Sequence, residues 1–83
     1  MTLKNKTIQP EEIKKIMGSA WEISPSVIPA DVQFNQFPQW DSFGHVTLLV
    51  ALEKEYGIKI DFSTLTKLTS INAILDYLNL NSE

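Results

Sequence analysis

The stretch 39-QWDSFGHVTLLVALEKEYGIKI-60 decides the fold, because it holds the longest apolar run of the chain between a helix start signal and a helix stop signal. Asp41 and Ser42 are residue types that cap helix N-termini, and Gly57 is the type that ends helices. The pattern therefore predicts a helix from Asp41 or Ser42 to about Tyr56. Its apolar side chains cover most of the circumference, which is typical of a helix at the centre of a bundle.

The core and solvent sides of this helix follow from a helical wheel at about 100° per residue. Phe43, Val46 and Tyr56 belong to the apolar positions and are expected in the core. The positions left for solvent are Gly44, Thr47, Lys54 and Glu55.

The segments on the N-terminal side predict a helix and a long loop. In 7-TIQPEEIKKIMGSAW-21, Pro10 suits the first helical turn, and apolar residues recur every three or four positions up to about Ala20 or Trp21. Residues 22–40 contain three prolines and no sustained periodicity, but many apolar side chains. They predict a long loop that is packed against the core.

The C-terminal part predicts two further helices. Residues 58–68 indicate a short extended piece and one turn of helix started by Asp61 or Ser63, and a closing helix starts at Thr69 or Ser70 and runs to about Leu80. No strand pair is expected. The fold class is therefore all-α, a four-helix bundle of three main helices and one short helix, with a long loop between the first and second helices. The chain is expected to be a single domain over residues 1–83.

Composition argues against several classes of function. The chain has 83 residues, a net charge of −3, seven lysines and no arginine, so it lacks the basic stripe that binds nucleic acid. Its apolar runs are far shorter than a bilayer span and its start lacks a signal-peptide core, so we expect a cytoplasmic protein without membrane insertion. We also expect a monomer. With no cysteine and one histidine, the chain is not expected to bind a metal or form disulfides.

Ser42 is the chemically distinctive residue. At the start of a helix the backbone N–H groups are unpaired and the helix dipole is positive, which favours a phosphate attached to the hydroxyl. Asp41 keeps this end of the helix polar.

The D-S-F run at positions 41–43, the long apolar helix, the short helix and the run T-S-I-N-A-I-L-D-Y-L at 69–78 together resemble acyl carrier proteins. The likeness extends from Asp41 to about Leu80. In that family the serine of a D-S-L or similar motif carries a 4′-phosphopantetheine arm through a phosphodiester. The resemblance implies that Ser42 carries this arm, that the reactive thiol lies at the end of the arm, and that partner enzymes do the chemistry.

The resemblance implies a carrier and not an enzyme, with no catalytic residue of its own. A magnesium-dependent phosphopantetheinyl transferase would install the arm from coenzyme A and would read Asp41 within the motif. An acyl- or aminoacyl-loading ligase and acyl-transferring enzymes would be the other partners. The expected contact positions for partners are Phe43, Val46, Glu53 and Glu55, with His45 as a further candidate.

Departures from the commonest fatty-acid carriers indicate a specialised biosynthetic pathway. Those carriers place acids shortly after the serine, where this chain has Gly44 and Thr47, and Lys54 weakens the negative field of Glu53 and Glu55. The run D-S-F-G-H-V is also similar to the D-S-M-G-type run of D-alanyl carrier proteins. The alternative within the carrier class is therefore a D-alanyl or other aminoacyl carrier.

Two alternatives of other classes do without the arm. In a small helical protein-interaction module, Ser42 would be only a helix cap worth about 1 kcal/mol. In an esterase-like enzyme, His45 would be the base for Ser42, but such a pair also needs an orienting group and an oxyanion site. We expect His45 to be a partially exposed surface residue beside the arm.

A last hypothesis concerns shelter for the cargo. In the family the helices can part to admit a tethered acyl chain, and a small residue in the closing helix would leave room for it. A solid core is expected if the cargo is an amino acid, because a charged ammonium group would not enter an apolar pocket. The positions concerned are Val46, Leu49, Ile60, Leu65, Leu68, Ile71 and Ala73.

Overall fold

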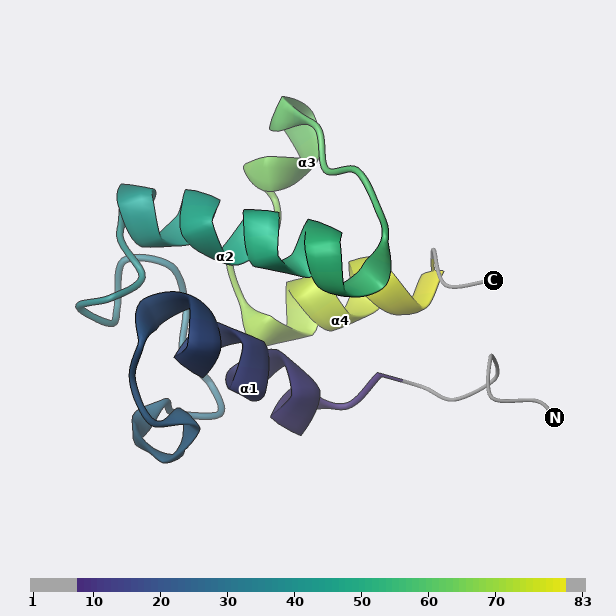
Figure 1. Cartoon of the computed structure of the whole chain (residues 1–83). Helices are drawn as coiled ribbons and strands as arrows, with labels where there is room; N and C mark the ends of the chain where they lie inside the picture. The colour runs from purple at the N-terminus through teal and green to yellow at the C-terminus, as the bar shows by residue number, and fades with distance from the viewer. Residues whose placement is uncertain (1–7, 81–83) are drawn as a thin grey trace, which may run out of the picture.

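The computed structural model describes residues 8–80, and within that range the chain is helical (Figure 1). The elements are α1 (Pro10–Trp21), a short 3-10 helix η2 (Pro25–Val27), α2 (Ser42–Tyr56), α3 (Phe62–Leu65) and α4 (Ile71–Leu80). The described residues form no strand, and one isolated antiparallel bridge joins Gln33 to Ser70. The predicted all-α, four-helix fold is confirmed. No helix within residues 8–80 has the length and apolar character needed to cross a membrane.

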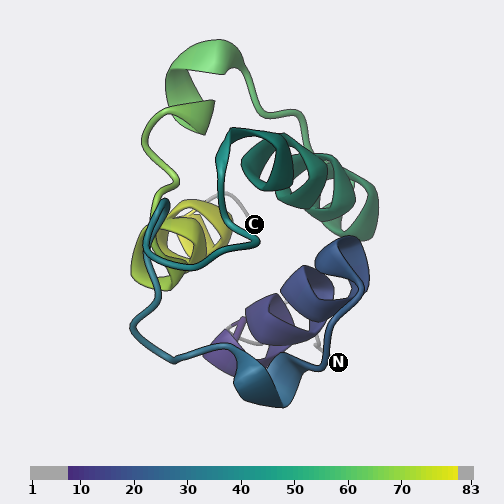
Figure 2. The same cartoon turned by 90° about the vertical axis from the view of Figure 1, so that its left-hand side faces the viewer.

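The three main helices share one apolar core. Figure 2 shows α1, α2 and α4 around a common centre, with the short α3 outside this group and next to α2. A fully buried side chain of this kind contributes roughly 2 kcal/mol, so the core outweighs any single polar contact of the fold. The buried apolar residues are Ile13, Met17, Ile28, Val32, Trp40, Leu48, Leu49, Leu52, Leu68, Ile71, Ile74 and Leu78.

Helix α2 begins and ends where the sequence predicts, and its cap is Asp41. The Asp41 Oδ1 accepts a hydrogen bond from the Gly44 N–H at 2.8 Å. At the other end, Gly57 adopts the left-handed conformation, with φ 65°, that favours glycine after a helix. Ser42 is thus the first residue inside the helix and not its cap.

Helices α3 and α4 start in the same way. Asp61 accepts a hydrogen bond from the Thr64 N–H at 2.8 Å, and the bonds from Thr64 hold the pKa of that carboxyl below its usual range. The Ser70 Oγ accepts a hydrogen bond from the Ala73 N–H at 3.0 Å, one residue before α4 begins. Asp61 and Ser70 were both among the predicted start positions.

The connection between α1 and α2 is packed, as predicted, with Val32 and Trp40 buried. The Phe34 N–H donates to the Thr69 carbonyl at 2.9 Å and so ties the loop to the segment before α4. The Asn35 N–H donates to the Trp40 carbonyl at 2.8 Å. Through these contacts the loop crosses one end of the bundle before it enters α2 (Figure 2).

Gly44 is buried, so the prediction that it lies on the solvent side of α2 is wrong. The Trp21 Nε1–H donates to the Gly44 carbonyl at 2.9 Å, so α1 lies directly against this turn. A Cβ on Gly44 would overlap the carbonyl oxygen of Gln39 and lie 3.2 Å from the Trp21 indole nitrogen. A helical wheel could not show this, because both neighbours come from other parts of the chain.

The prediction that Phe43 and Val46 lie in the core is wrong, because both are exposed. Tyr56 is half-buried and packs against the core. Of the positions expected in solvent, Lys54 and Glu55 are exposed, as predicted.

Replacing Gly44 with alanine should destabilise the protein by about 2 kcal/mol or more, because backbone must move to admit the Cβ. Helix propensity alone predicts the opposite sign, since alanine in a helix interior is favoured over glycine by about 1 kcal/mol. Urea unfolding measures the difference. The control is Gly57→Ala, where a Cβ meets no atom within 4 Å and only the left-handed backbone opposes it, at about 1 kcal/mol. A Gly44→Ala cost no larger than that of the control would contradict this packing.

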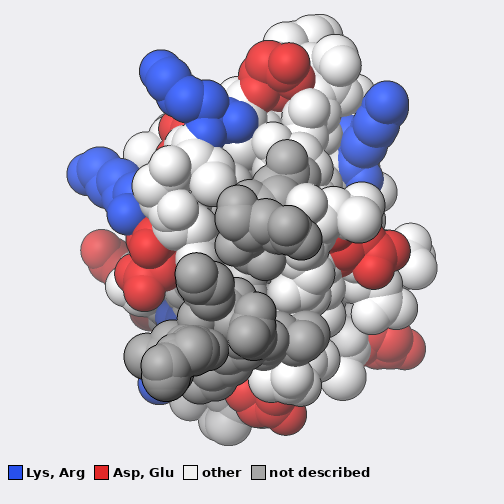
Figure 3. Space-filling model, turned by 90° about the vertical axis from the view of Figure 1, so that its right-hand side faces the viewer, with Lys and Arg blue, Asp and Glu red and all other residues white. Residues whose placement is uncertain are grey.

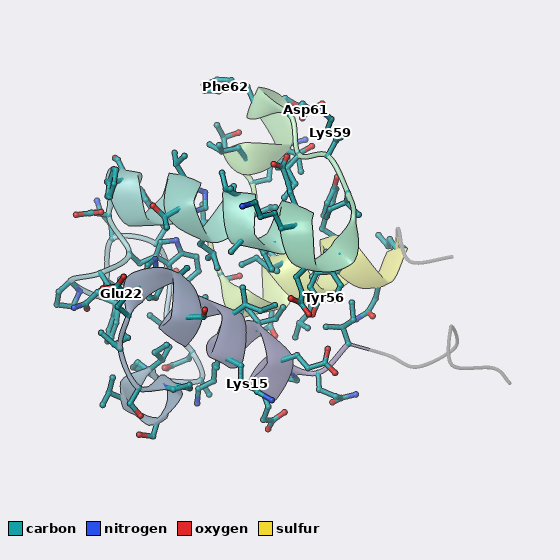
Figure 4. All side chains as sticks on the ribbon, in the orientation of Figure 1. Lys15, Glu22, Tyr56, Lys59, Asp61 and Phe62 are labelled. Carbon is teal, nitrogen blue, oxygen red and sulfur yellow. The ribbon has the colours of Figure 1, made fainter. Side chains whose placement is uncertain are left out.

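Tyr56 joins the end of α2 to α1 (Figure 4). Its hydroxyl donates to the Glu12 Oε1 at 3.3 Å. Partial burial, the negative charge of Glu12, the hydrogen bond to Glu12 and the charge of Glu55 raise the pKa of Tyr56 to about 12. The folded protein therefore holds the phenol proton more tightly than the unfolded chain does.

The stability that Tyr56 contributes through this proton should be complete below about pH 10 and lost as the pH rises toward 12. The difference in free energy of unfolding between the parent and Tyr56→Phe, from urea melts at several pH values, should shrink over that range. Glu12→Gln is the matched control: it removes the charge but keeps an acceptor, so part of the pH dependence should persist through burial. A parent-to-variant difference that stays constant from pH 9 to pH 12 would show that the pKa is not raised.

Candidate functional site

Ser42 lies at the exposed N-terminal end of α2, where the loop enters the helix. Its hydroxyl forms no hydrogen bond with another residue of the described range 8–80. The cap role that an interaction module would give to Ser42 belongs to Asp41. The hydroxyl is therefore open to a reagent and has no structural task in the helix.

The backbone around Ser42 suits a phosphodiester. The first N–H groups of a helix have no carbonyl partner within it and lie at the positive end of the dipole. The Asp41 carboxylate takes the N–H of Gly44, which leaves those of Ser42 and Phe43 for the oxygens of a phosphate on the serine. The residues present therefore fit a group joined to Ser42 through phosphate.

An exposed apolar strip runs along α2 from this end. Phe43 is 82% exposed and Val46 is 50% exposed, and Val50, one further turn along, is exposed as well. These three residues lie within about 60° of one another around the helix axis. A groove of about 440 Å³, lined by Trp21 and Thr47 among others, leaves one flank of Phe43 open.

The two acidic residues predicted as partner contacts lie on different sides of α2. The Glu53 carboxylate accepts a hydrogen bond from the Ile60 N–H at 2.7 Å, so it closes the turn after the helix as well as bordering the apolar strip. Glu55 is turned about 120° away from Phe43 and lines a groove with Lys15 of α1. On the face shown in Figure 3, lysine and acidic side chains are interspersed.

His45 is buried, with 5% of its surface exposed, which corrects the prediction of a partially exposed residue. Its Nδ1 accepts a hydrogen bond from the Trp40 Nε1–H at 2.9 Å, and its Nε2 lies 2.9 Å from the Leu65 carbonyl oxygen. Both ring nitrogens are therefore used away from Ser42, and the Ser42–His45 pair of the esterase alternative does not form. Burial also removes His45 from the candidate partner contacts.

Two exposed apolar residues, Val50 and Phe62, were not among the predicted contact positions. Val50 follows Phe43 by seven residues and Val46 by four, a spacing that marks one helix face and would have identified it. Phe62 is also exposed and lies at the outer edge of α3 (Figure 4). No sequence signal separates Phe62 from Leu65, the other apolar residue of α3, which packs partly against the core, because α3 has only one turn.

Comparisons with known proteins agree with the geometry of this site. The family model for the phosphopantetheine attachment site matches residues 11–78. The acyl carrier protein of Thermosynechococcus vestitus is 29% identical over 69 residues, which make up 83% of this chain and 85% of that protein. The match spans most of the chain, the first helix and the long loop included. The chain belongs to the phosphopantetheine attachment family: it is a carrier protein that bears a covalent 4′-phosphopantetheine and is not itself an enzyme.

Proposed function

We propose that Ser42 is the residue that carries the 4′-phosphopantetheine, and that the protein holds an acyl group on this arm as a thioester for delivery to partner enzymes. The observation that carries the proposal is an exposed serine hydroxyl, without a capping role, at the first residue of a 15-residue helix. The other serines near helix starts fit less well. Ser70 uses its hydroxyl to cap α4, and Ser63 lies in a helix of four residues.

The proposed contact surface for partner enzymes is the apolar strip of Phe43, Val46 and Val50, with Glu53 at its far end. Large apolar side chains gathered on one exposed helix face are typical of protein-interaction surfaces. Glu55, on the α1 side of the helix, would meet a different part of a partner. Asp41, directly before the modified serine, is proposed as the residue that the phosphopantetheinyl transferase reads.

The pathway we propose is a specialised one. The first turn of α2 contains no acidic residue after the Asp41 cap, and the exposed strip that follows Ser42 along the helix is apolar, so a basic partner finds little further charge to bind there. The lack of an acid at Gly44 is weaker support for a specialised pathway than the sequence suggested, because packing forbids any side chain at that position. An aminoacyl cargo is the second candidate. Incubation of the modified protein with acyl and aminoacyl adenylating ligases separates the two by which cargo forms the thioester.

The attachment is tested by incubating the protein with a broad-specificity phosphopantetheinyl transferase, magnesium and coenzyme A, followed by intact-mass measurement. The parent should gain one phosphopantetheine and Ser42→Ala should gain none. The matched control, Ser63→Ala, removes an exposed hydroxyl at another helix start and should gain one group like the parent. Modification of Ser42→Ala would contradict the assignment.

Ser42→Ala should also leave the stability of the unmodified protein within about 0.5 kcal/mol of the parent, because Asp41 caps the helix. Urea unfolding of both proteins checks this. A loss of about 1 kcal/mol or more would show that the serine has a capping role and would contradict a hydroxyl that is free for the arm.

A further inference from the structure

The ring of His45 joins two parts of the chain on either side of the serine. His45 is the one histidine of the sequence and lies three residues after Ser42, in the first turn of α2. Its Nδ1 bonds to Trp40, two residues before Ser42, and its Nε2 bonds to Leu65 in α3. The ring also packs against Phe34, with 5.1 Å between ring centroids.

The two partners determine the protonation state of this ring. An indole N–H can only donate, so Nδ1 must offer a lone pair to Trp40. A backbone carbonyl can only accept, so Nε2 must carry the proton that bonds to Leu65. The ring is therefore the neutral form with its proton on Nε2. A second proton on Nδ1 would point at the indole N–H, and that hydrogen bond would be lost.

Trp40 and α3 each rely on the His45 ring for a contact. None of the four residues of α3 is buried, so the contact at the Leu65 carbonyl anchors a helix that contributes little to the core. Trp40 is fully buried, and its indole N–H, which is costly to leave unpaired, has His45 as its partner. Loss of the ring contact would therefore loosen α3 and the entry of the loop into α2 together.

The surroundings offer no compensation for a charged ring. The side chains that contact the ring from the loop are aromatic. The carboxylates of α2's cap and α3's cap each accept a hydrogen bond from a backbone N–H of their own helix. Within residues 8–80 no carboxylate bonds to the His45 ring. The charged residues nearest in the chain to the ring partners Phe34, Trp40 and Leu65 are Asp31, Asp41, Lys67 and Asp61.

We propose that His45 is a positioning residue, which clamps Trp40 and α3 to the end of α2 that presents Ser42, and that this clamp opens when the ring takes up a second proton. Opening would free the end of α3 and change how the turn holds the serine. The consequence for the arm rests on the proposed function of Ser42, but the clamp itself does not.

The test is an NMR titration of the unmodified protein from pH 7.5 to pH 5, a range in which imidazoles commonly change charge. At pH 7.5 the ring nitrogens should show an unprotonated Nδ1 and a protonated Nε2. As the ring is protonated, the Trp40 indole N–H signal should move with it. The Trp21 indole N–H, bonded to the Gly44 carbonyl, is the internal reference and should move less.

Exchange protection of the α3 amides provides the second readout. The N–H groups of Leu65 and Thr66, bonded to the Asp61 and Phe62 carbonyls, should lose protection about fivefold to tenfold between pH 7.5 and pH 5, the factor expected for one lost hydrogen bond. The amides of Leu48 and Leu52 in α2 give the reference, after correction for the intrinsic effect of pH on exchange.

Two variants replace His45 with a side chain that does not change charge, and each can keep one of the two hydrogen bonds of the ring. His45→Asn places an acceptor near the position of Nδ1, and His45→Gln places a donor near that of Nε2. In both, the Trp40 signal and the protection of α3 should be independent of pH over this range. Persistence of either pH dependence in the variants would overturn the proposal.

The wild-type titration decides the question even if a variant fails to fold. A ring protonated on Nδ1 at pH 7.5, or a titrating ring with unchanged α3 protection, would overturn the clamp. A ring that stays neutral down to pH 5 would overturn its opening by protonation. Failure of the transferase to modify Ser42 in a protein that shows the expected ring signals would instead overturn the proposed function alone.

Discussion

The packing of Trp40 against the first turn of α2 is the contact on which the rest of the site depends. Trp40 is fully buried, its indole N–H is bonded to His45, and its ring centroid lies 5.7 Å from that of Trp21. Trp21 donates in turn to the Gly44 carbonyl. Together these contacts fix the point where the loop becomes helix, and so they fix Ser42. A carrier that presents its attachment residue to a transferase benefits from such a rigid support.

Successive residues of this turn have separate tasks because a helix turns each one about 100° from the last. Asp41 caps the helix, Gly44 allows α1 and the loop to approach closely, and His45 points inward. Ser42 and Phe43 point outward. The structure thus holds the turn from one side and leaves the other side open, where we propose that the arm is attached and that partners bind.

The start and end of each helix could be predicted from the sequence because caps are local. Asp41 bonds to a residue three positions later, and the conformation of Gly57 is a property of glycine itself. The directions of Gly44 and His45 could not be predicted in this way. Gly44 is buried by Trp21, 23 residues earlier, and His45 bonds to Leu65, 20 residues later. Apolar character likewise does not tell a core residue from an exposed one, and for that reason the prediction that Phe43 lies in the core was wrong.

The attachment of the arm to Ser42 is tested most directly by locating it within the chain. After modification by a transferase, cleavage at the lysines releases the segment 16–54, and fragmentation of this peptide by tandem mass spectrometry assigns the added group to one residue. The phosphopantetheine should be found on the hydroxyl of Ser42. Its presence on Thr47, on Ser63 in a different peptide, or on any other hydroxyl of the chain would contradict the site described above.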